Sequence, residues 1–417
     1  MNSLDIYLDP VKSPGVMSAK IWIREGSRAD PVRQKGAHQL LGSLLSRGCG
    51  PHSHDDVGDL VEGCGAGLHC ETYEDGFLIS LKCIERDAYT LLPLIGWMIK
   101  EPHLKRDQIN IEKTLSIQSL RRQKENPFYL AYDAWRRLAY GEGPYGHDPL
   151  GCIEDLQKIG KSELSLLSKE LVTRKKILVI SGTLPDDLIH KLNNIEPFSF
   201  LKQTSSTSPL VRTKNSIPKK FDNDARLILQ PIETSQIVMM LGLPTISHKH
   251  KDDLLLHLLS CHLGSGMSSK LFIELREKNG VAYDVGVHHP TKEYESPFIV
   301  HASTTQEKSK YTLQLLKQCW RGIIDSQLST ESLALAKAKY QGQIAHASQT
   351  VSQRAERKAH LLGLNLPLNH DQENLKRIES ITSEDLQIAA EKHLKKPLLS
   401  LCGPQQAIND IAQEWSI

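Results

Sequence analysis

The sequence lacks the features that mark a membrane protein or a disulfide-linked secreted one. Its longest apolar runs, such as LLPLIGWMI at residues 91–99, are far shorter than the roughly 20 apolar residues that span a bilayer. The eight cysteines include no Cys-x-x-Cys pair, and the initial MNSLDIYLDP has no basic stretch followed by an apolar one. Scattered thiols in a long chain predict reduced cysteines and a cytosolic protein rather than a disulfide framework.

A block of one charge sign is also missing. The 51 basic and 49 acidic residues give a formal net charge of +2, and they are mixed along the chain, so no nucleic-acid-binding surface is indicated. The hydrophobic fraction of 39% and the charged fraction of 24% predict a packed, soluble chain rather than a disordered one. A length of 417 residues is too great for one ordinary core and suits two domains of about 200 residues each.

Strand and helix patterns follow one another in a definite order in the first half. The β-rich segment 16–26 predicts a strand, and the apolar spacing that follows predicts helices at about 33–46 and 55–65. The other expected elements are one or two strands in 70–84, helices at 87–100 and 108–127, and a strand at 175–184. The long helix ends at Asn126-Pro127, because the residue before a proline resists helical geometry.

Residues 204–221 are rich in Ser, Thr, Pro and Lys and predict an interdomain linker. After it the order of elements begins again. The expected elements are strands at 226–231 and 235–244, helices at 250–264 and 269–280, strands at 281–289 and 296–305, and helices at 310–325 and 331–349. This recurrence predicts two tandem homologous domains, 1–203 and 222–417. Each is an α+β unit of an antiparallel sheet covered by helices.

Four segments in this order resemble the pitrilysin or insulinase-like zinc peptidase family, which includes mitochondrial processing peptidase. WIREGSRADPVRQKGAHQLLGSLLSRG resembles the family's strand, Gly-Ser-Arg turn and metal helix, and CETYEDGFLISL resembles the strand pair after it. IEKTLSIQSLRRQKENP resembles the helix with the last metal ligand, and LGSGMSSKLFIELREKNGVAYDV resembles the second-half signature. The resemblance implies that each chain forms half of a clam-like peptidase chamber.

The resemblance also implies positions for the metal site. Active members carry the inverzincin motif H-x-x-E-H, whose two histidines lie one helical turn apart and bind zinc together. The glutamate between them acts as general base, and a distal glutamate completes the metal ligands. By the letters, His38 falls on the first histidine, Leu41 on the base, Gly42 on the second histidine and Ser119 on the distal glutamate.

Residues of these types cannot form the zinc site. The neighbours of Ser119, Gln118 and Leu120, are not acidic either, so a one-residue shift does not restore the distal ligand. Leucine neither binds metal nor takes a proton, glycine has no side chain, and catalytic zinc sites usually have three protein ligands. We therefore expect no cofactor in this chain, and zinc in a partner subunit. The chain is interpreted as a pseudo-enzyme.

Two short segments contain other metal-ligating residue types. HSHDD at 52–56 and LHCE at 68–71 offer His52, His54, His69, Cys70 and Glu71. A His-x-His in a loop can bind metal, but a polar turn between helices is the favoured interpretation. His38 alone is better interpreted as a hydrogen-bonded, partly buried histidine, and His147 as part of a turn with a capping aspartate.

The second-half signature retains Arg276 and Tyr283, seven positions apart. The resemblance implies that both side chains point into the cleft near the scissile peptide. There the arginine supplies fixed donors for a carbonyl or oxyanion, and the tyrosine supplies a hydroxyl. A helix ending near Gly280 and followed by a strand brings the two residues together. The alternative is that Arg276 caps its helix and Tyr283 packs in the core.

A chain without the zinc half and with the Arg/Tyr half resembles the non-catalytic subunit of two-subunit bacterial members. The expected partners are a homologous H-x-x-E-H zinc subunit and peptide substrates, with no nucleic acid and no membrane; a homodimer is possible in isolation. LGSGMSSK at 263–270 is short, which argues against the presequence-reading loop of the mitochondrial subunit. The alternatives are a scaffold, like the core subunits of respiratory complexes, and a peptide-binding homodimer.

Overall fold

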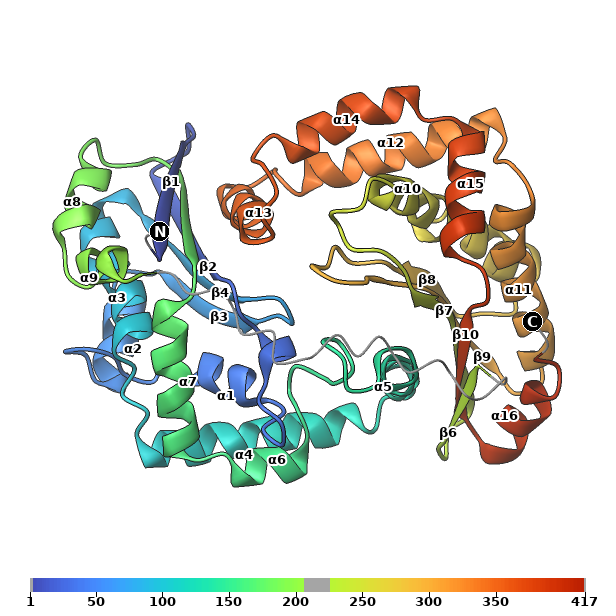
Figure 1. Ribbon diagram of the computed structural model, residues 1–417, viewed down its shortest axis with the longest axis horizontal. Coiled ribbons are helices and arrows are strands. Elements are labelled where there is room, and N and C mark those ends of the chain that lie inside the picture. Colours follow the sequence, from blue (N-terminus) through green and yellow to red (C-terminus); the bar gives the residue numbers. More distant parts are fainter. Residues whose placement is uncertain (1–2, 206–225, 416–417) are drawn as a thin grey trace. The chain divides into compact units, whose positions relative to one another are not determined.

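The computed structural model describes residues 3–205 and 226–415, which form two compact units (Figure 1). The first unit comprises the described residues of Met1–Leu120, His147–Lys214 and His346–His370. The second comprises those of Arg121–Gly146, Asn215–Ala345 and Asp371–Ile417. The expected linker at 204–221 lies outside the described residues except for its first two positions, so the boundary between residues 203 and 222 stays a prediction.

The first unit is built on a five-stranded mixed sheet. Its strands are β1 (Leu4–Pro10), β2 (Val16–Ile23), β3 (Gly67–Thr72), β4 (Phe77–Ile84) and β5 (Lys176–Gly182). Their order is β1-β5-β2-β4-β3, with β1 and β5 parallel and the other pairs antiparallel. Because side chains alternate along a strand, Ala19 and Ile21 of β2 enter one core and Trp22 enters another on the opposite face.

Helices enclose the larger core of the first unit. They are η1 (Ser27–Ala29), α1 (Ala37–Leu44), α2 (His54–Gly63), η2 (Glu85–Asp87), α3 (Ala88–Lys100), α6 (Ile153–Lys158), α7 (Lys161–Thr173), α8 (Leu188–Asn194) and α9 (Phe198–Gln203). Helix α4 (Arg106–Gln123) begins in this unit. Leu40 of α1, Ile95 of α3 and Leu167 of α7 meet the strands in one continuous apolar cluster. The expected helices and strands of this half are present, but α4 ends at Gln123, and Asn126-Pro127 begins the next helix rather than ending this one.

The second unit repeats this sheet. Its strands are β6 (Leu227–Pro231), β7 (Gln236–Pro244), β8 (Asp284–His288), β9 (Pro297–Thr305) and β10 (Leu398–Gly403), in the order β6-β10-β7-β9-β8. Strands β6 and β10 are parallel, as β1 and β5 are. Strand for strand, the two orders are the same, which confirms the duplicated α+β architecture. The sheets are mixed rather than purely antiparallel, because one edge pair in each runs parallel.

The second unit has its own set of helices. They are α10 (Asp253–Gly264), the π-helical η3 (Phe272–Lys278), α11 (Ser309–Asp325), α12 (Thr330–His346), α14 (His370–Ser380), α15 (Ser383–His393) and α16 (Gln405–Ala412). Leu258 of α10, Trp320 of α11 and Leu386 of α15 lie in one core with the strands. Within residues 3–205 and 226–415, no helix is both long and apolar enough to cross a bilayer.

Two helices pack on the sheet of the opposite half of the sequence. Helix α5 (Pro127–Tyr140) covers β7 and β10, where Ala131 and Trp135 pack against Met240. Helix α13 (Val351–Gly363) covers β2 and β5, where Ala355 and Ala359 lie beside apolar strand residues. The equivalent strands of both sheets are covered in the same way. This exchange of helices is not visible in the sequence pattern.

The signature segment differs in detail from its expected structure. The helix expected at 269–280 has π-helical hydrogen bonding from Phe272 to Lys278, and the amide of Val281 donates to the carbonyl oxygen of Leu275 over 2.8 Å. The expected strand at 281–289 begins only at Asp284, because the preceding amides close this wide turn. Gly280 has the left-handed φ of +57° expected after a helix end.

Candidate functional site

Helix α1 carries the residue that the letter match places at the first zinc histidine. The helix begins where Asp30 satisfies its free backbone amides, since Oδ2 accepts from the Gly36 N–H over 2.6 Å and Oδ1 from the His38 N–H over 3.0 Å. Leu40 and Leu44 on this helix are buried in the core of the first unit. One carboxylate therefore fixes the start of the helix and the position of the histidine.

The His38 ring is wholly buried among charged side chains. Its Nδ1 lies 2.7 Å from Oδ1 of Asp30, and its Nε2 lies 3.5 Å from Oε1 of Glu25. Nε2 of His147 lies 3.1 Å from the second oxygen of Asp30, and Arg174 forms an ion pair with Glu25. These five residues form what we call the His38 cluster. Both ring nitrogens of His38 face carboxylates, so neither is free to bind a metal.

The His38 cluster is charged at neutral pH. Burial alone lowers the pKa of His38, but the hydrogen bonds and charges of Asp30 and Glu25 outweigh burial and raise this pKa to about 9. Burial raises the pKa of Asp30, yet its bonds to His147 and His38 bring that pKa below its ordinary value. The pKa of Glu25 is lowered in the same way by His38 and Arg174. His38 is therefore an imidazolium, which has no lone pair for a metal.

Leu41 and Gly42, at the base and second-histidine positions, are part of the packed interior. Leu41 is fully buried in the apolar core. A Cβ atom on Gly42 would lie 2.5 Å from Oγ1 of Thr72 and 3.1 Å from a ring carbon of Phe77. These two side chains belong to β3 and β4 and approach closely because glycine has no Cβ. A side chain at this position therefore fits only if the side chains of Thr72 and Phe77 shift.

The partly exposed face of α1 carries Gln39 and Ser43, one position after the residues of the letter match. Arg47 continues this face just beyond the helix, and its Nε donates to Oε1 of Glu112 on α4 over 2.8 Å. This face is therefore directed towards α4. Amide and hydroxyl groups are not among the usual zinc ligands of proteins. Gln39 and Ser43 are therefore poor candidates for zinc ligands.

The distal position on α4 is also without a metal ligand. Ser119 is half-buried, Gln118 is exposed and Leu120 is buried in the core. The buried acidic residue of α4 is Glu112, whose charge is balanced by Arg47. No three His, Cys, Asp or Glu side chains in the described part of the first unit lie close enough together to hold a metal ion.

The histidine-rich turns of the first unit have structural partners. Ser53 and Asp56 form a capping box at the start of α2, and His54 Nε2 lies 3.2 Å from Nη1 of Arg47. His69 Nε2 lies 3.1 Å from Oε1 of Glu71 at an exposed site on β3. HSHDD therefore lies at the start of α2, as a polar helix-capping turn, whereas LHCE lies within β3 and is not the turn between helices that was expected.

Arg276 and Tyr283 both lie at the surface of the second unit. The Arg276 guanidinium carbon lies 5.0 Å from the centroid of the Phe272 ring, which supports the side chain from one face. Tyr283 is 67% exposed, and only its backbone is tied down, by a 3.0 Å bond from its N–H to the carbonyl oxygen of Ser303. Among the described residues, neither side chain has a hydrogen-bonding partner or an ion pair. Tyr283 is thus not a core residue, and both donors remain available.

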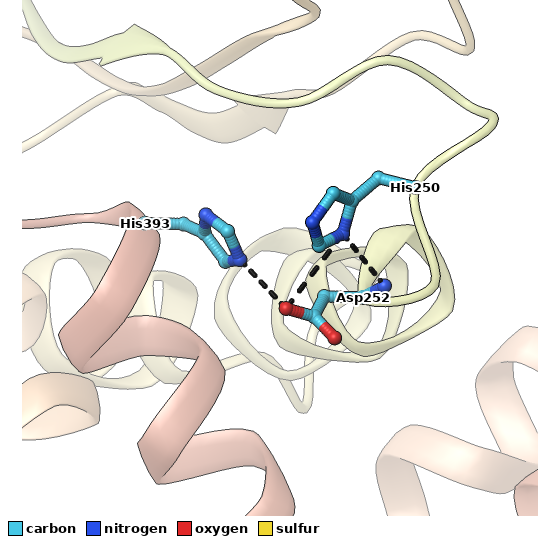
Figure 2. A group of neighbouring side chains, drawn as sticks. All are labelled: His250, Asp252 and His393. Carbon is cyan, nitrogen blue, oxygen red and sulfur yellow. Dashed lines mark hydrogen bonds and ion pairs between the residues drawn. The ribbon is translucent and has the colours of Figure 1, made fainter.

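A cluster that the sequence did not predict joins α10 to the end of α15. Oδ2 of Asp252 lies 2.8 Å from Nε2 of His393 and 3.7 Å from Nδ1 of His250 (Figure 2). The same oxygen lies 3.2 Å from Nζ of Lys392. Burial raises the pKa of Asp252, but the bonds from His393 and Lys392 bring that pKa below its ordinary value. The lysine already supplies positive charge, so these residues form an ion-pair network, which we call the Asp252 network.

Comparisons with known proteins agree with the duplicated fold. The model of the insulinase family, peptidase family M16, matches residues 12–147, and the model of the peptidase M16 inactive domain matches residues 177–340. A Helicobacter pylori protein described as the non-peptidase homolog YmxG is 24% identical over 371 residues, covering 87% of this chain and 83% of that protein. A Rickettsia felis protein described as an uncharacterized zinc protease is 23% identical over 334 residues, covering 79% and 78%.

Two solved structures share the fold. The peptidase M16 inactive domain from Pseudomonas fluorescens superposes with a TM-score of 0.84 at 20% identity, covering 96% of this chain and 95% of that one. A protease from Helicobacter pylori gives a TM-score of 0.82 at 19% identity, covering 97% and 98%. The fold defines a peptidase-type duplicated α+β protein. The chain belongs to the M16 peptidase family, and its sequence lacks the H-x-x-E-H motif.

Proposed function

We propose that this chain is the substrate-binding and regulatory subunit of a two-chain zinc metalloendopeptidase that acts on peptides. A homologous partner with H-x-x-E-H supplies the zinc and the general base. The observation that carries this proposal is that Arg276 and Tyr283 are exposed and without hydrogen-bonding partners among the described residues, while His38 is held in a buried ion cluster. The match to the M16 inactive-domain model supports the same role.

The two exposed side chains offer donors for a peptide in the course of cleavage. A guanidinium is always charged and presents several N–H groups in a fixed plane, which suits a carbonyl oxygen that gains negative charge. The phenol of Tyr283 adds one O–H donor. Guanidinium and phenol groups act as donors rather than as bases, so neither is suited to activating water. The chain therefore assists the reaction in this proposal and does not start it.

The edge of the second sheet supports peptide binding. Strand β8 is last in the order β6-β10-β7-β9-β8, so its outer side has no strand partner among the described residues. Tyr283 directly precedes this strand. An extended peptide can add to such an edge through backbone hydrogen bonds. Its carbonyl groups would then pass beside the tyrosine hydroxyl.

We place this role in the cytosol, which the eight free thiols support, since a reducing compartment keeps cysteines unpaired. Fractionation of cells with an antibody to this chain tests the location. Recovery with periplasmic or extracellular material would contradict it.

The test of the role compares three samples against one fluorogenic peptide: this chain, a zinc chain of the family with H-x-x-E-H, and a mixture of both. We expect activity in the mixture that far exceeds the sum of the separate chains and is abolished by a chelator. Gel filtration checks that a complex forms. Failure of every such zinc chain to bind this one, together with a stable homodimer, would favour a peptide-binding homodimer or scaffold instead.

A further inference from the structure

A second group of histidine and aspartate side chains lies close to the Asp252 network but differs from it in chemistry. Asp253 begins α10, His257 lies one turn further on the same face, and His289 directly follows β8. One ligand atom from each residue lies within 4.8 Å of the other two, and Oδ2 of Asp253 is 3.5 Å from Nε2 of His257. All three belong to the second unit. We call them the Asp253 triad.

The tautomer of His289 is fixed by its backbone contact. Its Nδ1 lies 2.9 Å from the carbonyl oxygen of Pro297, and because a carbonyl only accepts, Nδ1 carries the proton. Nε2 therefore holds a lone pair. This atom is buried and has no hydrogen-bond partner among the described residues. His289 as a whole is 9% exposed. Metal-binding histidines are commonly oriented in this way, with the second nitrogen donating to a carbonyl.

Asp253 has a free oxygen in the same place. The residue is 7% exposed, and its Oδ1 is buried without a hydrogen-bond partner in the described part of the chain. The other carboxylate oxygen, Oδ2, lies 3.5 Å from Nε2 of His257, so both oxygens of Asp253 lie inside the triad. A buried carboxylate oxygen without a partner is costly unless a cation balances it.

The surroundings leave both imidazoles able to act as ligands. The rings of His257 and His289 are adjacent, with centroids 4.7 Å apart. His248, which is 4% exposed, also has both ring nitrogens buried without a partner in the described residues. In the described residues no lysine or arginine pairs with the triad, in contrast to Lys392 in the Asp252 network.

We propose that Asp253, His257 and His289 bind a zinc ion. Two imidazoles and one carboxylate are a common zinc ligand set, and bonds of about 2.0–2.2 Å in a tetrahedron place ligand atoms about 3.3–3.5 Å apart. The 3.5 Å between Asp253 and His257 already matches this spacing, and small side-chain rotations bring in His289. Asp253 and His289 are buried and His257 is partly exposed, so the three side chains would leave the fourth tetrahedral position to a water molecule.

The zinc would link the first turn of α10 to the connection between β8 and β9, which follows the signature segment. This site is separate from the degenerate positions of the first unit, and it departs from the sequence-based expectation that the chain itself holds no cofactor. It does not depend on the proposed function, because a structural metal can serve a subunit, a scaffold or a homodimer equally.

The test uses the full chain, stripped with a chelator and then titrated with Zn²⁺ by calorimetry, with metal content checked by elemental analysis. We expect one zinc per chain. Asp253→Asn keeps the size of the side chain, and both it and His289→Ala should weaken binding by more than the roughly 10–100-fold that loss of a supporting contact costs. His393→Ala, in the Asp252 network, and His38→Ala are matched controls that should keep full affinity.

Cobalt provides a readout that does not depend on the variants folding well. Co²⁺ bound to the unmodified chain should give the intense visible absorption of a tetrahedral nitrogen and oxygen site, and Zn²⁺ should displace it. Absence of zinc binding by the unmodified chain would overturn the proposal. So would equal zinc affinity in His289→Ala, loss of zinc in His393→Ala, or uptake of iron but not of zinc.

Discussion

Nδ1 of His38 lies 2.7 Å from Oδ1 of Asp30, and both side chains are fully buried. An imidazolium therefore occupies the start of the helix on which active family members place a zinc ligand. The proton on the ring balances the negative charge of Asp30 and Glu25. The charges at the start of this helix therefore stabilise the fold.

Removing the ring should leave two buried carboxylates poorly balanced. We expect His38→Ala to lower the free energy of unfolding by about 3–5 kcal/mol, the usual cost of removing one partner of a buried ion pair. Urea unfolding at neutral pH measures the change. His69→Ala is the matched control, since His69 is largely exposed and pairs only with Glu71, and its effect should be below about 1 kcal/mol. Equal effects would contradict the role of the His38 cluster.

The same cluster should make stability depend on pH. The pKa of His38 is about 9 in the folded chain, above its ordinary 6.5, so its stabilising contribution is complete below about 6.5 and is lost as the pH rises through 9. The pKa values of Asp30 and Glu25 are lowered, so their contributions are lost as the pH falls. The difference in unfolding free energy between the unmodified chain and His38→Ala should shrink from pH ~6.5 to ~9.5. A constant difference would show that His38 is neutral.

Gly42 should not accept the family's histidine. Because even a Cβ would lie 2.5 Å from Oγ1 of Thr72, we expect Gly42→Ala to destabilise the chain by about 1–3 kcal/mol through overpacking. The triple change Leu41→Glu, Gly42→His and Ser119→Glu should not create a zinc site at α1. Gly58→Ala on α2 is a control, since a Cβ at this position would have no other atom within 4 Å among the described residues. If Gly42→Ala were as stable as the unmodified chain, the Thr72 and Phe77 side chains would be shown to move aside at little cost.

The exchanged helices predict effects in the opposite half of the sequence. Trp135 on α5 is fully buried, and Trp135→Ala should cost about 3–5 kcal/mol and increase amide hydrogen exchange in β7 and β10. Trp22→Ala is the reciprocal control and should instead increase exchange in β2 and β5, under α13. If Trp135→Ala raised exchange in β2 and β5 instead, the assignment of α5 to the second sheet would be wrong.

Local pattern predicted the strands and α-helices between β2 and α4, strand β5 and the elements from β6 to α12, but it did not predict β1, α5–α9, α13–α16 or β10, or how the strands pair. Two local patterns could be recognised in the sequence because they depend only on neighbouring residues. They are the alternation in residues 16–26 and the helical spacing around Leu40 and Leu44. The parallel pairing of β1 with β5 joins residues far apart in the chain, and no local signal specifies it. The exchange of α5 and α13 was missed for the same reason.

The candidate site residues were also predicted only in part from the sequence. The family resemblance identified Arg276 and Tyr283. Their exposure depends on the tertiary structure and could not be predicted from the sequence. The Asp253 triad was missed because His289 lies far along the chain from α10. The four-residue spacing of Asp253 and His257 in the sequence DLLLH was the one available signal, and by itself it describes many ordinary helix faces.

Turnover of one fluorogenic peptide by the two-chain complex tests the central claim most directly. Arg276→Ala should lower kcat by about 10²–10³, the usual effect of losing one preorganised donor, and Tyr283→Phe should lower it less, since only a hydroxyl is removed. Arg321→Ala and Tyr311→Phe, both at exposed positions of α11, are controls that should leave turnover unchanged. Complex formation by gel filtration should be the same for all five proteins. Full activity of Arg276→Ala and Tyr283→Phe, or chelator-resistant activity of this chain alone, would contradict the account.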